Sequence, residues 1–469
     1  MGEELSPEWD QHPANPYTWP ARKKWTVVFI ASLVTFIVGL NATSITTAAE
    51  DISEEFDLDN DMFEYNFLSV TAWNAAAAFI SLATLPLMDN YGVRRVYLTC
   101  YVLFTIFLIP QALAHNFATL VVCRVIAGAT GGTLQGSADA IAANMFPHIH
   151  ERALPLTCYV FSLVFGVTMG PVLGALIKPL DWRWVFWIEL ILGGALLPAV
   201  FIFLKETRGS VLYAEYFPVD SDNAETPSNA NLALHEFYSV TTRSAVFLTT
   251  ELPIVLFTLW SSFAFGLVFI FTQSIPLVFG SAFGWAAYQS GLVQSAVGIG
   301  QILGFGVCMI QRHIYISSAH RNAEKPGDPV PEAILQLSIP ATPIALAGGL
   351  FMYGWSIHQS HWIVTAIGLA LVGFASMVII NAATIYITDA YSAFAASAIA
   401  AVAFGENVFA AFLPLAAKPM YERLNYDWAS SLLGFVGLAL TLAPLLLLLH
   451  GKKIRSKSRF IRAGVETSG

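Results

Sequence analysis

Residues 154–177 read LPLTCYVFSLVFGVTMGPVLGALI and contain no Asp, Glu, Lys or Arg. A helix that crosses the hydrocarbon layer of a membrane, about 30 Å thick, needs about 20 mostly apolar residues. This stretch has that length and composition, so the sequence predicts a membrane-spanning helix here. The composition of the whole chain also indicates a membrane protein. Of its residues 56% are hydrophobic and only 12% are charged, whereas soluble proteins carry about 25% charged residues.

Similar apolar segments recur along the whole chain and predict twelve spans. The others lie near 25–48, 65–87, 96–114, 120–145, 184–204, 247–271, 288–309, 339–357, 362–386, 394–421 and 428–450. The ninth span is the weakest, because Pro340 and Pro343 lie at its start. The predicted fold class is an all-α membrane protein with two six-helix bundles.

The polar stretches divide this predicted fold into five parts. The longest, 205–246, contains DSDNAETPSNAN and has too little apolar surface to pack, as in a disordered linker. The predicted parts are an N-terminal arm (1–24), a first bundle (25–204), a linker (205–246), a second bundle (247–450) and a basic tail (451–469).

The distribution of Lys and Arg predicts the orientation in the membrane, because cytoplasmic loops carry an excess of these residues. With both termini inside, four cations lie outside: Lys178, Arg183, Lys418 and Arg423. Those inside are Arg22, Lys23, Lys24, Arg94, Arg95, Arg152, Lys205, Arg208, Arg243, Arg312, Arg321, Lys325, Lys452, Lys453, Arg455, Lys457, Arg459 and Arg462. Both termini are therefore expected in the cytoplasm, with the plasma membrane as the expected location.

Two motifs narrow the class of protein. Between spans two and three the chain reads LPLMDNYGVRRVY, in which Asp89 precedes Gly92 and Arg94. Glycine permits a tight bend, and the arginines hold the loop on the cytoplasmic side. In span five, GVTMGPVLG places Gly166, Gly170 and Gly174 four residues apart around Pro171. Small residues at this spacing let two helices approach closely, and a proline inside a span kinks it.

These motifs resemble those of the major facilitator superfamily. The first resembles its loop motif, whose carboxylate belongs to an ion-pair network between the two halves, although Leu85 and Val93 depart from the pattern. The span-five motif is similar to the antiporter motif of its drug:proton exporters. Further stretches resemble the fungal twelve-span drug:proton antiporters: NPYTWPARKKW, DWRWVFWI, KETRGSVL, HWI, ITDAYSAFAASAIAA, YERLNYDWASSLL and GKKIRSKSRF.

The resemblance implies the major facilitator fold, with two six-helix bundles related by pseudo-two-fold symmetry. It implies a secondary active transporter that exports small organic molecules, such as a drug, a toxin, a secondary metabolite or an organic acid, by proton antiport and alternating access. It implies no cofactor beyond the proton gradient, a small-molecule substrate, the lipid bilayer as surroundings and a monomer. Three departures from the group bear on cargo: Glu406 stands in span eleven where an arginine is usual, Ile334 replaces another arginine, and the linker is acidic. They argue against the standard drug or polyamine specificity of the group. The loss of the span-eleven arginine together with the gain of Glu406 favours a neutral or cationic cargo.

Ionisable residues inside spans are candidates for proton coupling, because a charge at mid-bilayer costs at least about 2.5–3.5 kcal/mol. Arg124 resembles the family's span-four arginine, implicated in proton transfer, and Asp139 lies on the same broad face of that helix. The predicted coupling and gating set is Asp89, Arg94, Arg124, Asp139 and Glu406. Glu189 is expected near the outer interface in a structural role.

The substrate cavity is predicted from polar and aromatic residues on the helices that line such cavities. These are Asn41, Trp73, Asn74, Gln135, Trp260, Phe263, Gln294, Gln301, Asn381, Tyr386 and Asn407. Ser44 is a further candidate in span one.

Several alternatives stay open or are disfavoured. A carrier for uptake of a small metabolite keeps the fold but reverses the direction, and the GVTMGPVLG pattern argues against it. A non-transporting membrane sensor is a second alternative. An enzyme is not expected, since the histidines lie near span ends without metal-ligand spacing. A nucleic-acid partner is not expected either, because the net charge is -9 and such partners need a basic surface.

Overall fold

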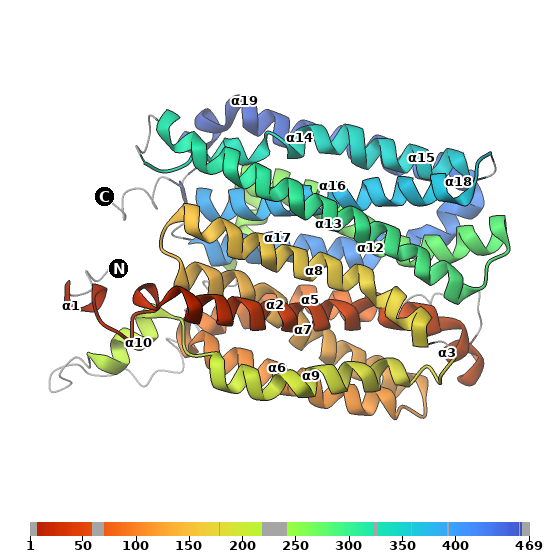
Figure 1. The fold of residues 1–469 in the computed structure, drawn as a ribbon, viewed down its shortest axis with the longest axis horizontal. Coiled ribbons are helices and arrows are strands. Elements are labelled where there is room, and N and C mark those ends of the chain that lie inside the picture. Colours follow the sequence, from red (N-terminus) through yellow and green to blue (C-terminus); the bar gives the residue numbers. More distant parts are fainter. Residues whose placement is uncertain are drawn as a thin grey trace.

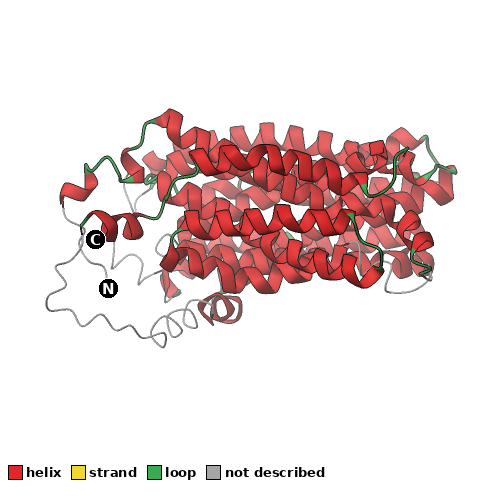
Figure 2. Ribbon diagram, turned by 90° about the horizontal axis from the view of Figure 1, so that it is seen from below, coloured by secondary structure: helices red, strands yellow, loops and turns green. Residues whose placement is uncertain are grey.

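The described part of the chain consists of helices joined by loops and contains no strand (Figure 2). The computed structural model describes residues 7–58, 70–177, 179–217, 242–322, 327–357, 359–391, 394–458 and 460–461. The end of the predicted loop after span one (59–64), the start of span two (65–69) and most of the linker (218–241) therefore lie outside the described residues. The same holds for Lys178, Lys325, Arg459 and Arg462.

The first half of the chain forms one set of long helices (Figure 1). They are α2 (Ala21–Thr43), α5 (Ala72–Tyr91), α6 (Val93–Ala112), α7 (Phe117–Met145), α8 (Ile149–Ile177) and α9 (Trp184–Phe203). Shorter helices flank them: α1 (Pro7–Asp10), η1 (Pro16–Thr18), η2 (Ser44–Ala48), α3 (Ala49–Glu55) and α10 (Gly209–Tyr216).

The second half forms a second set. Its long helices are α12 (Leu252–Phe283), α13 (Ala287–Ser317), α16 (Trp362–Ala390), α17 (Ala395–Phe412), α18 (Ala417–Leu440) and α19 (Leu442–Lys457). The shorter ones are η4 (Ser318–Arg321), η5 (Pro331–Leu335), α14 (Ser338–Ala341), η6 (Thr342–Ala347), α15 (Gly348–Ser356) and η8 (Leu413–Ala416). At the predicted ninth span α14, η6 and α15 follow one another, and η6 is a π-helix that contains Pro343.

Among the described residues, ten segments are long and apolar enough to cross a membrane. One of them, Ala395–Ser456, holds two crossings, because the helix bounds of α18 enclose Asn425, whose φ of 59° breaks the helix. The helix α5 adds a shorter apolar stretch, Ala72–Leu85. With these two additions the helices correspond to the twelve spans predicted from the sequence.

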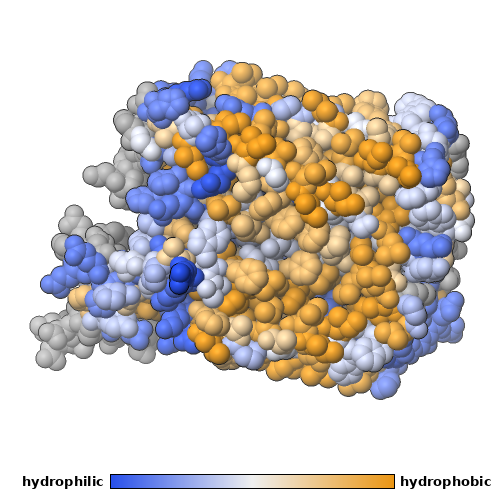
Figure 3. Space-filling view, in the orientation of Figure 1, coloured by the Kyte–Doolittle hydropathy of each residue, from blue (hydrophilic) through white to orange (hydrophobic). Residues whose placement is uncertain are grey.

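The surface confirms a membrane-embedded molecule. On the face shown in Figure 3, a broad hydrophobic band crosses the middle of the molecule, with hydrophilic residues gathered at both ends. Exposed apolar side chains such as Phe29, Phe79 and Leu303 belong to this lipid-facing surface. In water such a continuous apolar surface would be unfavourable, whereas it matches the hydrocarbon layer of a bilayer.

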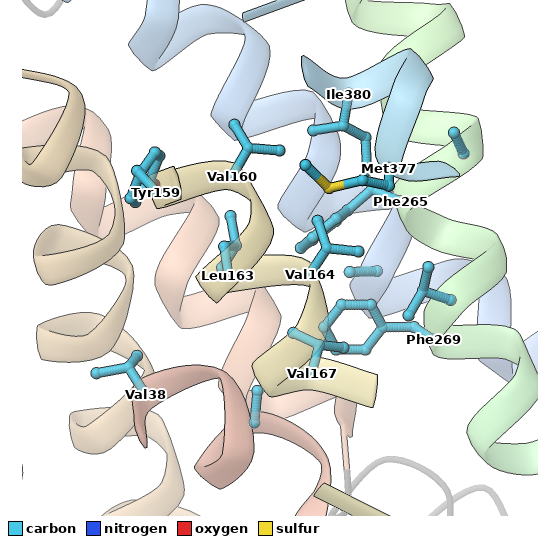
Figure 4. Close-up of a cluster of buried hydrophobic side chains, with 14 of the residues drawn as sticks. Val38, Tyr159, Val160, Leu163, Val164, Val167, Phe265, Phe269, Met377 and Ile380 are labelled. Atoms are coloured by element: carbon cyan, nitrogen blue, oxygen red, sulfur yellow. The ribbon is translucent and has the colours of Figure 1, made fainter. Parts of the chain in front are cut away.

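The two helix sets meet mainly along two pairs of helices, α8 with α13 and α5 with α17, and α8 also contacts α12 and α16. The α1 helix and α19 lie at the same end of the molecule (Figure 1), which we call the termini end; the opposite end is the far end. Most side chains of α8 that face the second set are apolar. In Figure 4, Val160, Val164 and Val167 point toward Phe265, Phe269 and Met377.

Candidate functional site: two buried carboxylates at a central cavity

A cavity of about 40 Å³ lies where the two helix sets meet, between α7 and α8 on one side and α12, α16 and α17 on the other. Asp139 of α7 and Glu406 of α17 both line it, and they are only 4% and 8% exposed. One acidic group from each set therefore contributes to the same small cavity.

Helical spacing explains why these residues share the cavity. Gln135 and Asp139 are four residues apart on α7, while Ile399, Val402 and Glu406 recur at intervals of three and four on α17. Residues at these intervals lie on one face of a helix. The cavity thus receives one helix face from α7 and one from α17, and each face carries a carboxylate.

Few hydrogen bonds satisfy the two carboxylates. The Ser261 hydroxyl donates to Glu406 Oε1, while Asp139 Oδ1 has no hydrogen-bond partner among the described residues. The Tyr159 hydroxyl, which also lines the cavity, donates to the carbonyl oxygen of Gln135. A buried charge without a partner is costly, so a proton or a cationic group would stabilise this site. The sequence did not predict Tyr159 or Ser261, because single hydroxyl groups inside spans carry no distinctive signal.

A larger cavity of about 310 Å³ adjoins the central one toward the termini end. The two cavities share Gly136, Asp139 and Ile399 among their lining residues. The larger one is also lined by Tyr17, which follows α1, and by a group of cations, Arg152, Arg208 and Arg243. Asp139 therefore lines both cavities, while Glu406 lines the central one.

The far end is closed by direct contacts between the two sets. Thr71 Oγ1, just before α5, donates to the carbonyl oxygen of Ala411 on α17 at 2.8 Å. Gln301 Nε2 of α13 donates to Thr168 Oγ1 of α8 at 2.6 Å. A Cβ placed on Gly291 of α13 would lie 2.9 Å from the Ala175 side chain. The structure is thus open at the termini end and closed at the far end.

This conformation predicts a difference in reactivity along α17. Ala396 lines the larger cavity and is exposed, whereas Ala411 is fully buried at the far end. Cysteine reactivity follows exposure, so we expect Ala396→Cys to react with a membrane-impermeant maleimide at least about tenfold faster than Ala411→Cys. Labelling would be followed by mass spectrometry in detergent, in a background that lacks the four native cysteines. Equal rates at the two positions would contradict the closed far end.

Four of the predicted cavity and coupling residues come together at the central cavity: Gln135, Asp139, Glu406 and Asn407. The other predicted cavity residues are buried and line neither cavity. The Trp260 indole donates to Thr342 Oγ1 at 3.2 Å, and Asn74 Nδ2 donates to the Val70 carbonyl at 2.9 Å. The remainder of this buried group is Asn41, Trp73, Phe263, Gln294, Gln301, Asn381 and Tyr386.

Arg124 lies in a separate buried network inside the first set. Its guanidinium donates to the carbonyl oxygens of Asn41 (2.6 Å) and Ala42 (3.0 Å) at the end of α2. Glu189, fully buried in the first two turns of α9, accepts from Asn41 Nδ2 at 2.7 Å and from Ser44 Oγ at 2.6 Å. Trp73 Nε1 completes the network by donating to Asn41 Oδ1. These contacts satisfy carbonyls that the end of α2 leaves unpaired.

The glycines of the GVTMGPVLG motif form a close contact between α8 and the first span. A Cβ on Gly166 would lie 2.5 Å from the carbonyl oxygen of Phe36, and a Cβ on Gly170 would lie 2.8 Å from the backbone nitrogen of Ser44. A Cβ on Gly174 would likewise collide with the Thr47 side chain and lie 2.6 Å from the carbonyl oxygen of Ser44. Pro171 lies inside the helix. The motif therefore serves close packing of two helix backbones.

The loop motif between spans two and three contacts the end of α9. Gly92 has a φ of 87°, a conformation that glycine adopts without strain. The Glu206 carboxylate, which the sequence alone did not mark as functional, accepts from the backbone nitrogens of Val93 and Arg94, both at 3.0 Å. A carboxylate at a helix N-terminus is favourable. The side chain of Asp89 lies outside the described residues, so its predicted ion pair stays a prediction.

The comparison with protein families identifies the chain. The family model described as Major Facilitator Superfamily matches residues 31–317. The chain belongs to the major facilitator superfamily. This is a family of transporters and not of enzymes, as the sequence predicted.

Relatives of this major facilitator protein span nearly its whole length. The efflux pump radE of Floropilus chiversii is 30% identical over 97% of this chain and 85% of its own. The MFS transporter cpaT of Aspergillus oryzae is 31% identical over 96% of this chain and 92% of its own. The chain is thus similar to fungal transporters, one of them named an efflux pump.

Solved structures show the same fold. The human organic anion transporter MFSD10 superposes with a TM-score of 0.63 at 16% identity, over 91% of this chain and 100% of that one. The proton:xylose symporter XylE gives a TM-score of 0.65 at 15% identity, over 92% of this chain and 96% of that one. At these identities the likeness concerns the fold alone, and it confirms the predicted major facilitator fold.

Proposed function

We propose that this transporter exports a small organic molecule, such as a drug, a toxin, a secondary metabolite or an organic acid, in exchange for protons. The observation that carries the proposal is the pair Asp139 and Glu406, two buried carboxylates from opposite helix sets at one central cavity. The name of the related efflux pump and the GVTMGPVLG sequence support export as the direction.

The cavity offers a site where proton and cargo compete. A proton on Asp139 or Glu406 removes a buried negative charge, and so does a cationic group of the cargo. Both therefore stabilise the same site, and each displaces the other. The apolar side chains of Leu163, Phe265 and Ile380, which also line the cavity, suit a cargo with hydrophobic parts.

Alternating access provides the transport step. In this family two helix bundles rock about a site near the midplane of the membrane. The Lys and Arg distribution supports a placement of both termini on the cytoplasmic side of the plasma membrane. With that placement the described state is inward-open. Cargo enters through the larger cavity, the far-end contacts open, and a proton from outside takes the place of the cargo.

The direction of transport is tested in inside-out membrane vesicles with an acidic interior. A radiolabelled azole, spermidine and an aromatic organic acid would serve as probes, and vesicles without the transporter as the control. The proposal expects at least one probe to accumulate inside the vesicles and to leave when the pH gradient is collapsed. Movement of the same probe out of the vesicles, down the proton gradient, would instead identify an uptake carrier.

A further inference from the structure

The end of the chain packs on the second helix set at the termini end. Ser458, directly after α19, is only 7% exposed. Its hydroxyl donates to Glu251 Oε2 at 2.7 Å and accepts from the backbone nitrogen of Ile461 at 3.2 Å. The Tyr391 hydroxyl donates to the same oxygen of Glu251 at 2.9 Å. The Ser458 hydroxyl thus joins the end of the chain to the start of α12.

Aromatic contacts extend this attachment to the wall of the larger cavity. The Phe460 ring lies 4.7 Å from Phe247 and 5.8 Å from Phe394, measured between ring centroids. The Arg243 guanidinium lies 5.2 Å from the Phe394 ring. Both Arg243 and Phe394 line the larger cavity. Ser458, Phe460 and Ile461, which we call the C-terminal latch, therefore support residues that line the open end.

A second anchor holds α19 near the latch. Arg455 Nη1 forms an ion pair with Glu332 Oε1, and both side chains are only 12% exposed. A Cβ on Gly451 would collide with the Glu332 side chain, so α19 approaches this carboxylate closely. The attachment of α19 therefore does not depend on Ser458, and loss of the Ser458 contact would free the latch alone.

The sequence around Ser458 reads Arg455-Ser456-Lys457-Ser458-Arg459, with cations three and one residues before the serine and one after it. Charge patterns of this kind guide the choice of substrate by protein kinases. Ends of a chain open more readily than helix interiors, which gives an enzyme access to a hydroxyl that the closed latch buries.

We propose that Ser458 is a phosphorylation site and that its modification releases the C-terminal latch from the wall of the larger cavity. A protein kinase selective for basic segments transfers the γ-phosphoryl group of ATP to Ser458 Oγ. A P–O bond to the serine forms, the bond between the β- and γ-phosphates breaks, ADP leaves, and the hydroxyl proton passes to the kinase base. The proposal rests on the cytoplasmic placement of the termini, where ATP is available, and is independent of proton coupling.

Electrostatics explain the release. A phosphoserine carries a charge of about -1.5 to -2 at neutral pH. It would stand beside the Glu251 carboxylate, which is only 5% exposed, and like charges repel strongly where water is excluded. The hydrogen bond from Ser458 to Glu251 would be lost as well, since the phosphate ester has no proton to donate at that oxygen.

Hydrogen–deuterium exchange of the peptide around 454–461 tests the release in the full-length protein. Ser458→Glu is expected to raise the exchange rate at least about tenfold, as loss of a hydrogen bond to a charged group would. Ser456→Glu is the matched control, because Ser456 lies in the same basic segment but is exposed and donates to the Lys453 carbonyl. Adding Glu251→Gln to Ser458→Glu should restore slow exchange, since it removes the repulsion.

Incubation with the catalytic subunit of the cAMP-dependent protein kinase and ATP tests the site itself. We expect mass spectrometry to place the phosphate on Ser458, and the phosphorylated protein to exchange as fast as Ser458→Glu. Equal exchange rates in the Ser458→Glu and Ser456→Glu proteins would contradict the proposed release of the C-terminal latch. The same holds if adding Glu251→Gln to Ser458→Glu has no effect on the exchange rate. Phosphate on Ser456 with none on Ser458 would contradict the proposal that Ser458 is the phosphorylation site. Neither measurement depends on transport, so failure here leaves the exporter proposal untouched.

Discussion

Replacing either central carboxylate, by Asp139→Asn or Glu406→Gln, is expected to reduce cargo-coupled proton flux at least about 100-fold, because a positioned group that transfers a proton contributes about 10²–10⁴-fold in enzymes. Both substitutions keep the size of the side chain and remove its ability to ionise. The measurement is the change of internal pH in proteoliposomes after addition of a transported cargo.

The two variants should differ in a second assay. Exchange of labelled for unlabelled cargo without a pH gradient needs the cargo site but no proton transfer. The variant whose carboxylate serves only the proton should retain this exchange, while the variant whose carboxylate also binds the cargo should lose it. Glu422→Gln is the matched control, since Glu422 is exposed on α18 and the substitution is the same. Normal proton flux in both cavity variants would show that the proton uses another site.

Replacing Gly166 by leucine is expected to prevent correct folding. Even a Cβ at this position would lie 2.5 Å from the carbonyl oxygen and 3.1 Å from the Cα of Phe36. These are backbone atoms, which cannot move to another rotamer as a side chain can. Overpacking a dense core costs about 1–3 kcal/mol, occasionally more, and here two helix backbones would have to separate. The yield of monodisperse protein and its unfolding temperature measure the effect.

Gly194→Leu provides the control for this second prediction. Gly194 lies on α9 and is exposed, and a Cβ added there would meet no atom within 4 Å. The same substitution there should leave the unfolding temperature within a few degrees of wild type, because a leucine on a lipid-facing surface is favourable. If the two variants were equally stable, the close contact between α8 and α2 would not be needed for the fold.

The sequence predicted the spans well because membrane crossing needs long apolar segments, and such segments are visible in one dimension. The predicted ends of the helices were wrong where a helix end is determined by contacts with other parts of the fold. The first span breaks at Thr43, whose φ of -126° ends α2, and Arg124 stabilises that break from another helix. The seventh span runs to Phe283, beyond its predicted end, because Pro276 is accommodated inside the helix.

The site could be predicted only in part. Asp139 and Glu406 stood out as ionisable residues in apolar surroundings, and both line the cavity. Asn41 and Trp73 were equally suited as polar groups inside spans, yet they contact Arg124 and Glu189 in a network away from it. Which face of a helix meets the opposite bundle depends on helix rotation, and that rotation is set by close contacts such as Gly128 against the Trp73 backbone.

The exchange of cargo for protons is tested most directly by measuring both fluxes in one preparation. Proteoliposomes that contain an internal pH dye and a labelled cargo identified in the vesicle assay would be placed in acidic buffer. The account predicts that cargo leaves while the interior acidifies, with both fluxes lost together in the Asp139→Asn, Glu406→Gln double variant. Cargo that leaves at the same rate without acidification of the interior would contradict proton antiport and identify a facilitator.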